Sequence, residues 1–382
     1  MPDVKTVLAA NQEISKNVLG PNADAVDQSR TFPRENIQAL GRAGVLGLLV
    51  PAQFGGAGGA LAELSQAVDT QAQDCSSTAM IMLMHFCATA VIAAQGSDAL
   101  KEKILPAVAR GQHLSTLAFS ESGSGGHFYI PVSEVVANGA GKHLSASKSF
   151  VTSANEADSY VVSARKAHAA SPTESNLYLL PKNTAGLATL GVFQGLGLTA
   201  NSSAPMKLEN VALDDASLLG PEGSGFQTML GVVLPNFGIG AASVSVGIAT
   251  AAFQAATTHV TSRKYEHAGG APLAAIPRVQ FLIAEMAIEL AAARAYLQEA
   301  IRKATTGDPA AMLDIMGVKA KCAEAANAVL WRAMTLGGGW AFGRRGGLER
   351  MFRDAQAAAV MAPSSDVLKE FIGKACLGLP LF

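Results

Sequence analysis

The spacing of apolar residues divides the chain into three stretches. From Val4 to Leu114, apolar side chains recur three and four residues apart, for example at Val7 and Ile14, which predicts amphipathic helices. Between Leu117 and Leu219 the pattern changes to short β-rich runs separated by clusters of Gly, Asn, Ser and Asp. From Gly225 onward long alanine-rich helical stretches return, and such helices joined by short loops are typical of an antiparallel bundle.

These patterns predict an α+β protein with an all-α N-terminal domain (1–115), a middle β-barrel-like domain (116–222) and a C-terminal four-helix bundle (223–382). Within the first domain, the predicted helix from Asp74 to Gln95 is apolar nearly all round, so we expect it to be buried. His85 lies in its middle. It is either a core histidine with satisfied hydrogen bonds or a side chain that faces a substrate cavity.

The composition narrows the classes of function. The chain has 382 residues, of which 49% are hydrophobic and 15% charged, and this apolar share favours an oligomer over a monomer. The formal net charge is −1 and no basic tract is present, which argues against a nucleic-acid partner. We expect no membrane association and a cytoplasmic location, because no uninterrupted apolar run reaches about 18 residues and the N-terminus has no apolar core typical of a signal peptide.

Cysteine and histidine spacing predicts no metal site. The four cysteines lie far apart without a Cys-x-x-Cys pair, which indicates reduced thiols. The seven histidines also lack metal-ligand spacing.

The stretch from Leu117 to Ala154 carries the strongest candidate site. Two strand-like runs flank a polar, glycine-rich loop, Ser120–His127, with the sequence SESGSGGH. Its glycines allow positive φ angles and let backbone N–H groups approach a ligand. After the loop, Phe150 stands near the hydroxyl of Thr152, a combination that suits a flat heterocycle with polar edges.

Taken together, SESGSGG, KSFVTSA and the following ADSYVV resemble the flavin-binding middle domain of the acyl-CoA dehydrogenase family. In that family a Thr-Glu-Pro-Gly-x-Gly-Ser loop and a Lys-x-Trp-Ile-Thr-Asn strand hold the isoalloxazine ring. The resemblance covers almost the whole chain, including the turn VPAQFGGAG and the exit strand VALDDASLLG. It implies FAD as the cofactor and a dimer or a tetramer built as a dimer of dimers.

The resemblance also assigns cofactor-binding residues. The positions that contact the flavin ring are Ser120, Phe150 and Thr152. The positions that face the diphosphate or the adenine part in the family, partly from a neighbouring subunit, are Arg263, Thr335, Gly338, Gly339, Ser364 and Asp366. A guanidinium fork suits two phosphates, although an interface ion pair is the alternative for Arg263 and a helix C-cap is the alternative for the glycines.

The catalytic position departs from the family pattern. A family dehydrogenase removes the proton α to a thioester carbonyl with a glutamate while hydride leaves the β-carbon for the flavin. The frame that carries this glutamate reads RDAQAAAVMAPS here, and Ala362 occupies the catalytic position. Other members carry the base on the first long helix of the bundle, where this chain offers Phe237 and Gly238. Neither known position holds a carboxylate.

Three residues remain as candidate catalytic groups: His85, His127 and Asp366. His127 follows the loop where the family has an aspartate, and an imidazole titrates near pH 7, but a histidine on a loop can equally be solvated. Asp366 is either a contact of the neighbouring flavin or a relocated base.

Three functions follow from these observations. The first is an acyl-CoA-dehydrogenase-like flavoenzyme that oxidises a C–C bond of an acyl thioester, with an electron-transfer flavoprotein as redox partner. The second is a monooxygenase that receives reduced flavin from a separate reductase and needs no α-proton base. The third is a flavin-binding structural paralogue without activity.

Overall fold

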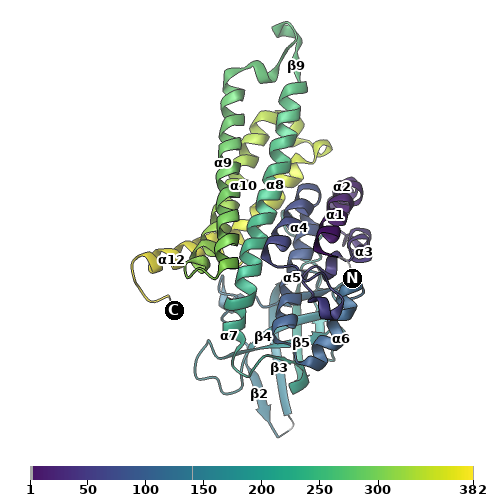
Figure 1. Ribbon diagram of the computed structural model, residues 1–382, viewed down its shortest axis with the longest axis vertical. Coiled ribbons are helices and arrows are strands. Elements are labelled where there is room, and N and C mark those ends of the chain that lie inside the picture. Colours follow the sequence, from purple (N-terminus) through teal and green to yellow (C-terminus); the bar gives the residue numbers. More distant parts are fainter. Residues whose placement is uncertain (1–2, 140, 382) are drawn as a thin grey trace.

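The protein has a helical domain, a β-domain and a long helical bundle in chain order (Figure 1). This computed structural model describes residues 3–139 and 141–381. The first strand begins at Ser115, and the first helix after the strands begins at Gly225, so the change of period in the sequence coincides with the change of structure. The predicted α+β organisation is therefore confirmed.

The N-terminal domain is built from helices only. They are α1 (Val4–Ile14), α2 (Gly20–Ser29), α3 (Arg34–Arg42), α4 (Leu61–Asp74), α5 (Ser76–Gln95) and α6 (Asp98–Ala109). Local chemistry sets several starts: the side chain of Asp3 accepts a hydrogen bond from Thr6 N, and Ser97 does the same for Leu100 N. As expected from its composition, α5 is buried along most of its length.

The middle domain consists of two four-stranded sheets. Its strands are β1 (Ser115–Ala118), β2 (Val135–Asn138), β3 (Gly141–Val151), β4 (Ser159–Arg165), β5 (Ser175–Pro181), β6 (Leu187–Thr189), β7 (Ala204–Leu213) and β8 (Leu218–Leu219). One sheet has the order β1-β4-β5-β8 and the other β2-β3-β7-β6. β1 and β4 are parallel, and the other paired strands of these sheets are antiparallel. Their own apolar core, with Leu144, Tyr160 and Leu208, fixes the loops at the strand ends.

The C-terminal domain rises away from the β-domain as a bundle of long helices (Figure 1). Its helices are α7 (Gly225–Thr228), α8 (Leu234–Ser262), α9 (Pro277–Thr306), α10 (Ala311–Phe342), α11 (Leu348–Val360) and α12 (Ser365–Cys376). A π-helical turn, Met229–Val233, joins α7 to α8. A small hairpin, β9 (Lys264–Tyr265) and β10 (Ala271–Pro272), caps the far end between α8 and α9.

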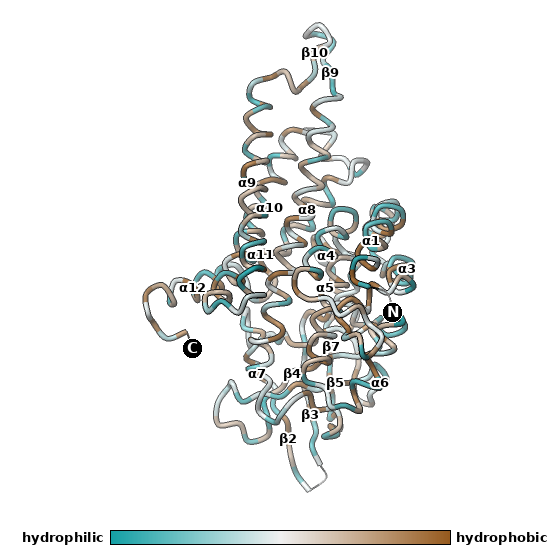
Figure 2. The backbone as a smooth tube through the Cα atoms, in the orientation of Figure 1, coloured by the Kyte–Doolittle hydropathy of each residue, from teal (hydrophilic) through white to brown (hydrophobic). Residues whose placement is uncertain are grey.

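Helix α8 is the central element of the molecule, because it packs against α4 and α5 of the first domain as well as α10. Small residues make this close packing feasible. A Cβ on Gly240 would lie 2.1 Å from Leu83 Cδ1, and a Cβ on Gly247 would lie 2.4 Å from the backbone oxygen of Asp69. The apolar core that results runs from α1 to α12, and the hydrophobic segments of α5 and α8 lie within it (Figure 2).

Two of the described helical segments are long and apolar enough to cross a membrane by length and composition. They are Ser76–Gln95, with a mean hydropathy of 1.8, and Gly225–Ser262, with 1.7. This differs from the sequence expectation, which considered uninterrupted apolar runs only. In the fold, 78% and 83% of these windows are buried inside the protein, as in core helices.

Candidate functional site

A buried ion pair anchors the glycine-rich loop between β1 and β2. Glu121, 3% exposed, accepts hydrogen bonds from Val132 N at 2.7 Å and Ser133 N at 3.0 Å, and from Lys148 Nζ at 2.6 Å. Lys148 is fully buried in β3 and also donates to the backbone oxygen of Ser163 at 2.6 Å. The carboxylate therefore ties both ends of the loop to the two sheets, which leaves the glycines between them free to face a ligand.

The pKa shifts follow from this geometry. Burial disfavours the Glu121 carboxylate, but the Lys148 ammonium and the Ser133 donors outweigh it and hold the pKa of Glu121 below its ordinary value. Burial lowers the pKa of Lys148, and the charge of Glu121 acts against this shift. The distance of 2.6 Å between Lys148 Nζ and Glu121 Oε1, with further oxygen acceptors around Nζ, indicates that both side chains are charged.

The loop lies against the start of α12. A Cβ on Gly126 would lie 3.1 Å from Val367 Cγ2 and 3.7 Å from Ser364 Oγ, so the glycine allows a close approach. Ser364 caps the helix, because its hydroxyl accepts from Val367 N. The glycine-rich backbone and a helix N-terminus thus meet, and both favour a bound anion such as a phosphate.

Phe150 and Thr152 lie beside this loop. The backbone N–H of Ser149 donates to the oxygen of Ser120 at 2.8 Å, which joins the loop to β3 one residue before Phe150. Phe150 is 59% exposed and contacts Phe193 edge-on, with ring centroids 5.0 Å apart. Thr152 is buried next to it. An exposed aromatic ring, a hydroxyl and a glycine-rich backbone are groups that would hold a flavin.

The turn between α11 and α12, which carries Ala362, is held by a buried lysine. Lys319 of α10 is 1% exposed, and its Nζ donates to the backbone oxygens of Ala358 at 3.2 Å, Met361 at 3.1 Å and Pro363 at 2.8 Å. The ammonium also lies 5.7 Å from the ring centre of Phe237. Burial lowers the pKa of Lys319 to about 7, while the three carbonyls favour its charged form. Lys319 therefore holds the turn that carries Ala362 through three hydrogen bonds.

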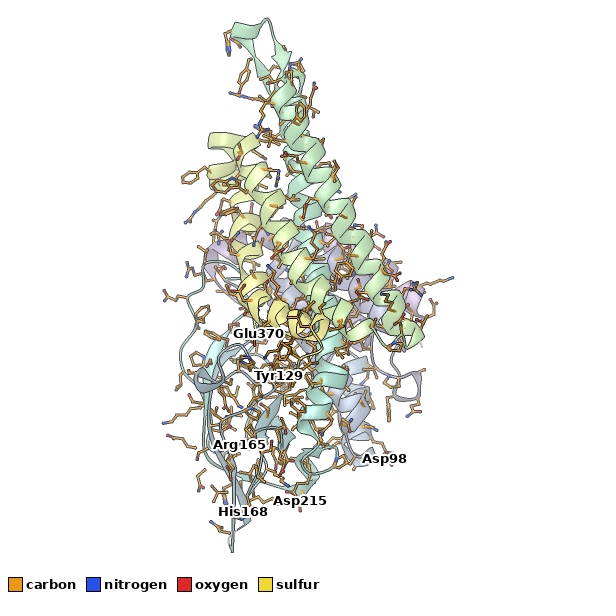
Figure 3. The ribbon with its side chains drawn as sticks, turned by 90° about the vertical axis from the view of Figure 1, so that its left-hand side faces the viewer. Asp98, Tyr129, Arg165, His168, Asp215 and Glu370 are labelled. Carbon is orange, nitrogen blue, oxygen red and sulfur yellow. The ribbon has the colours of Figure 1, made fainter. Side chains whose placement is uncertain are left out.

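An apolar pocket of about 130 Å³ opens beside the same turn. Four elements and the loop surround it; its lining residues are Tyr129, Leu230, Leu234, Met312, Met316, Pro363, Leu368, Phe371 and Leu381. Tyr129 forms one wall through ring contacts with Phe226 and Phe371, with centroids 6.1 and 6.0 Å away. Figure 3 shows it beneath α12, close to Glu370. The lining contains neither a carboxylate nor an imidazole.

The remaining predicted cofactor residues lie at the other end of the bundle. Arg263 follows the last turn of α8, and Gly338 and Gly339 lie near the end of α10. Stacking of His259 on Trp340, with centroids 4.3 Å apart, brings these two helix ends together. Gly338 has φ 52° and ψ −132°, so it interrupts α10, a conformation that side chains rarely adopt. Thr335 lies one turn earlier, its hydroxyl bonded to the oxygen of Trp331.

This group lies far from the loop of the same chain. Lys319, which binds the turn before α12, and Gly338 lie 19 residues apart on α10, or roughly 28 Å at about 1.5 Å per residue. Ser364 and Asp366, which the resemblance assigns to the adenine part of a neighbouring flavin, lie at the start of α12. Ser364 is against Gly126 of its own chain, and Asp366 is exposed in the first turn of the helix.

The candidate catalytic histidines have different surroundings. His85 is fully buried: its Nδ1 accepts from Ser115 N at 3.1 Å, so its Nε2 carries the proton and donates to the oxygen of Leu46 at 3.0 Å. Burial lowers the pKa of His85 to about 4. Both ring nitrogens are thus occupied, as in a structural core histidine. His127 is half-buried on the loop and lies edge-on to Tyr129, which lines the pocket.

Sequence reasoning missed Glu121, Lys148 and Lys319 as positioning residues. Lys148 lies in a strand between Ser147 and Ser149, and Lys319 lies in a largely apolar helical stretch. In both cases the sequence could indicate only that a charged side chain occupies a core-facing position. The partners that neutralise these charges are distant in the chain. Their roles therefore became visible only in the fold.

Comparison with known proteins agrees with this architecture. Three family models match in the order of the domains: acyl-CoA dehydrogenase N-terminal domain at residues 2–112, middle domain at 116–211 and C-terminal domain at 223–377. The mitochondrial short-chain specific acyl-CoA dehydrogenase of Bos taurus is 30% identical over 358 residues, which cover 93% of this chain and 85% of that protein.

Solved structures share the fold. Butyryl-CoA dehydrogenase from Megasphaera elsdenii superposes with a TM-score of 0.91 at 24% identity, covering 99% of both chains. The structure described as PigA with FAD and proline gives 0.90 at 20% identity, covering 98% of this chain and 97% of that one. These matches show that the chain belongs to the acyl-CoA dehydrogenase family and is a flavin-dependent oxidoreductase.

Proposed function

We propose that this chain oxidises the CH–CH group of an acyl thioester, or of a similar acyl carrier substrate, without a carboxylate at position 362. The packing of the anchored loop against the start of α12, directly after the turn that carries Ala362, supports this most directly. Bound FAD would supply the acceptor for two electrons. Residue 362 matches the family position of the catalytic glutamate, yet it is alanine.

The roles of the protein's residues follow from their positions. Phe150 would pack on the flat ring, the hydroxyls of Thr152 and Ser120 would bond its polar edge, and the Gly126 backbone with the α12 N-terminus would hold phosphates. Lys319 keeps the turn in place. Since the pocket lining offers no base, proton removal would fall to a group at its rim, and we propose His127 or Asp366 for this role.

A second candidate function is a flavin-dependent monooxygenase on the same scaffold. It is favoured by one observation: the residues around the turn are Ala362, Phe237 and an apolar pocket lining, none of which accepts a proton. Oxygenation needs no α-proton base. The redox partner would then be a flavin reductase that supplies reduced flavin, whereas the first function calls for an electron-transfer flavoprotein that takes electrons away.

We further propose that the active form is a dimer or a tetramer. Arg263, Gly338 and Gly339 match family positions that contact the diphosphate, but Gly338 lies roughly 28 Å along α10 from Lys319, which binds the turn beside the loop of the same chain. A second copy is needed to bring both groups to one cofactor. Light scattering that finds only single chains at micromolar concentration would contradict this.

The function is tested by mixing FAD-loaded protein with a panel of acyl-CoA thioesters without oxygen. Bleaching of the flavin absorbance by one of them is expected for the dehydrogenase function. If the flavin is bleached only by an external reductase, and oxygen is then consumed, the monooxygenase function replaces it.

A further inference from the structure

We propose that the apolar pocket beside Ala362 is a binding site for one compact hydrocarbon ring, preferably aromatic, carried by the substrate. That the ring belongs to the substrate rests on the proposed function, whereas binding of the ring does not. The proposal assigns a class of ligand to the pocket between α8, α10 and α12. The amide-bearing pantetheine arm of a thioester is the occupant that this proposal excludes from the pocket.

The lining determines which chemistry the pocket can accept. Leu368, Leu234 and Met316 are 1%, 5% and 6% exposed, and the other aliphatic side chains come from Leu230, Met312 and Leu381. An amide group placed among such side chains loses its hydrogen bonds to water and finds no partner. A hydrocarbon group, in contrast, loses unfavourable contact with water.

The size of the pocket limits the ligand to about one ring. Cavities of about 150 Å³ lined by Leu, Ile and Phe stay dry and bind benzene. The pocket here has a volume of about 130 Å³, so it holds a group of that size but no fused ring system.

The chemistry of the walls favours an aromatic ring over a saturated one. Met312 and Met316 supply two thioethers on one helix, and sulfur packs favourably near the edge of aromatic rings. Tyr129 and Phe371 contribute ring faces and edges on another side, with their centroids 6.0 Å apart. Both kinds of contact are weaker for a saturated ring.

The position of the pocket connects it to the chemistry. Pro363 forms part of its wall and directly follows Ala362, and its carbonyl is bound by Lys319 at 2.8 Å. Tyr129, another lining residue, contacts His127 of the loop edge-on, with 5.8 Å between ring centroids. A ring bound here therefore lies next to the turn and the loop that frame the proposed flavin site.

Calorimetric titration of the FAD-loaded protein tests the proposal, with benzene, cyclohexane and pantetheine as probes. We expect saturable binding of benzene, weaker binding of cyclohexane and no binding of pantetheine. Two filling variants from different elements, Leu230→Trp and Met316→Phe, should each weaken benzene binding at least tenfold. The exposed-site control Val136→Phe, on β2, should leave it unchanged.

Three results would overturn the proposal. The first is that pantetheine binds to the wild type and that the filling variants abolish this binding. The second is that the wild type does not bind benzene, and the third is that both filling variants still bind it. A variant that enlarges the pocket gives an independent test. Leu368→Ala should bind naphthalene, which we expect the wild-type pocket to exclude. Binding of these probes does not require turnover, so failure of acyl-thioester oxidation would overturn the proposed function and leave this result standing.

Discussion

Removal of the ammonium of Lys148 tests how the loop of the flavin site is held. In Lys148→Met the carboxylate of Glu121, 3% exposed, would keep its N–H donors from the loop but lose its counter-charge at 2.6 Å. Breaking a buried ion pair in this way costs about 3–5 kcal/mol, because one charge remains buried without its partner. The double variant Lys148→Met/Glu121→Gln removes that uncompensated charge, so we expect it to cost less than the two single variants together by about 2–3 kcal/mol.

Denaturant unfolding followed by circular dichroism measures these free energies, and retention of FAD during gel filtration reports on the loop. The sign of the pH dependence follows from the lowered pKa of Glu121: its contribution is present above the ordinary value of 4.5 and is lost as the pH falls below it. Additive effects of the two single variants, or a cost below about 1 kcal/mol for Lys148→Met, would refute the role assigned to the pair.

Three further predictions concern the turn, the core and the base. Lys319→Met should lower the unfolding free energy by about 1.5–3 kcal/mol, since it removes charged hydrogen bonds to three carbonyls, and an unchanged urea midpoint would contradict this. His85 is neutral in the fold, its pKa being about 4 instead of 6.5, so it stabilises above pH 6.5 and this contribution disappears as the pH falls toward 4. The stability difference between wild type and His85→Gln should therefore shrink over that range, and a constant difference would show that the pKa of His85 is the same in the folded and unfolded states. Ala362→Glu should raise acyl-CoA oxidation about 10²–10⁴-fold if only the base is missing, although Pro363 restricts the backbone of residue 362. Background turnover in this variant, together with loss of reductase-dependent oxygen consumption in His127→Ala, would favour the monooxygenase.

Much of the fold was predictable because local patterns and tertiary structure agree. The switch of hydrophobic period near Leu117 and the return to helix at Gly225 correspond to the start of β1 at Ser115 and of α7. Small residues along α8 already indicated a closely packed helix. The sequence could not show that its glycines face α5 and α4, because these contacts join residues far apart in the chain.

The candidate site was predictable in part. The motif identified the glycine-rich loop, Phe150 and Thr152, which the fold brings together. The buried pairings of Lys148 and Lys319 were missed, since a lysine in a strand or helix gives no local indication of its acceptors. For His85 the sequence left two alternatives, a core histidine or a cavity-facing one, and in the fold the backbone of Ser115 and Leu46 occupies both of its nitrogens.

Placement of Ser364 also required the structure. The motif gave its position in the chain, but its contact with Gly126 joins residues more than 200 positions apart and could be seen only in the fold.

The change in substrate mass tests the central claim most directly. FAD-loaded protein is incubated with a ring-bearing acyl thioester, once with an artificial electron acceptor without oxygen and once with a flavin reductase and isotopically labelled oxygen. The proposed function predicts loss of two hydrogen atoms in the first reaction and no labelled oxygen in the product of the second. Incorporation of a labelled oxygen atom, with no dehydrogenated product, would contradict it and identify the protein as a monooxygenase.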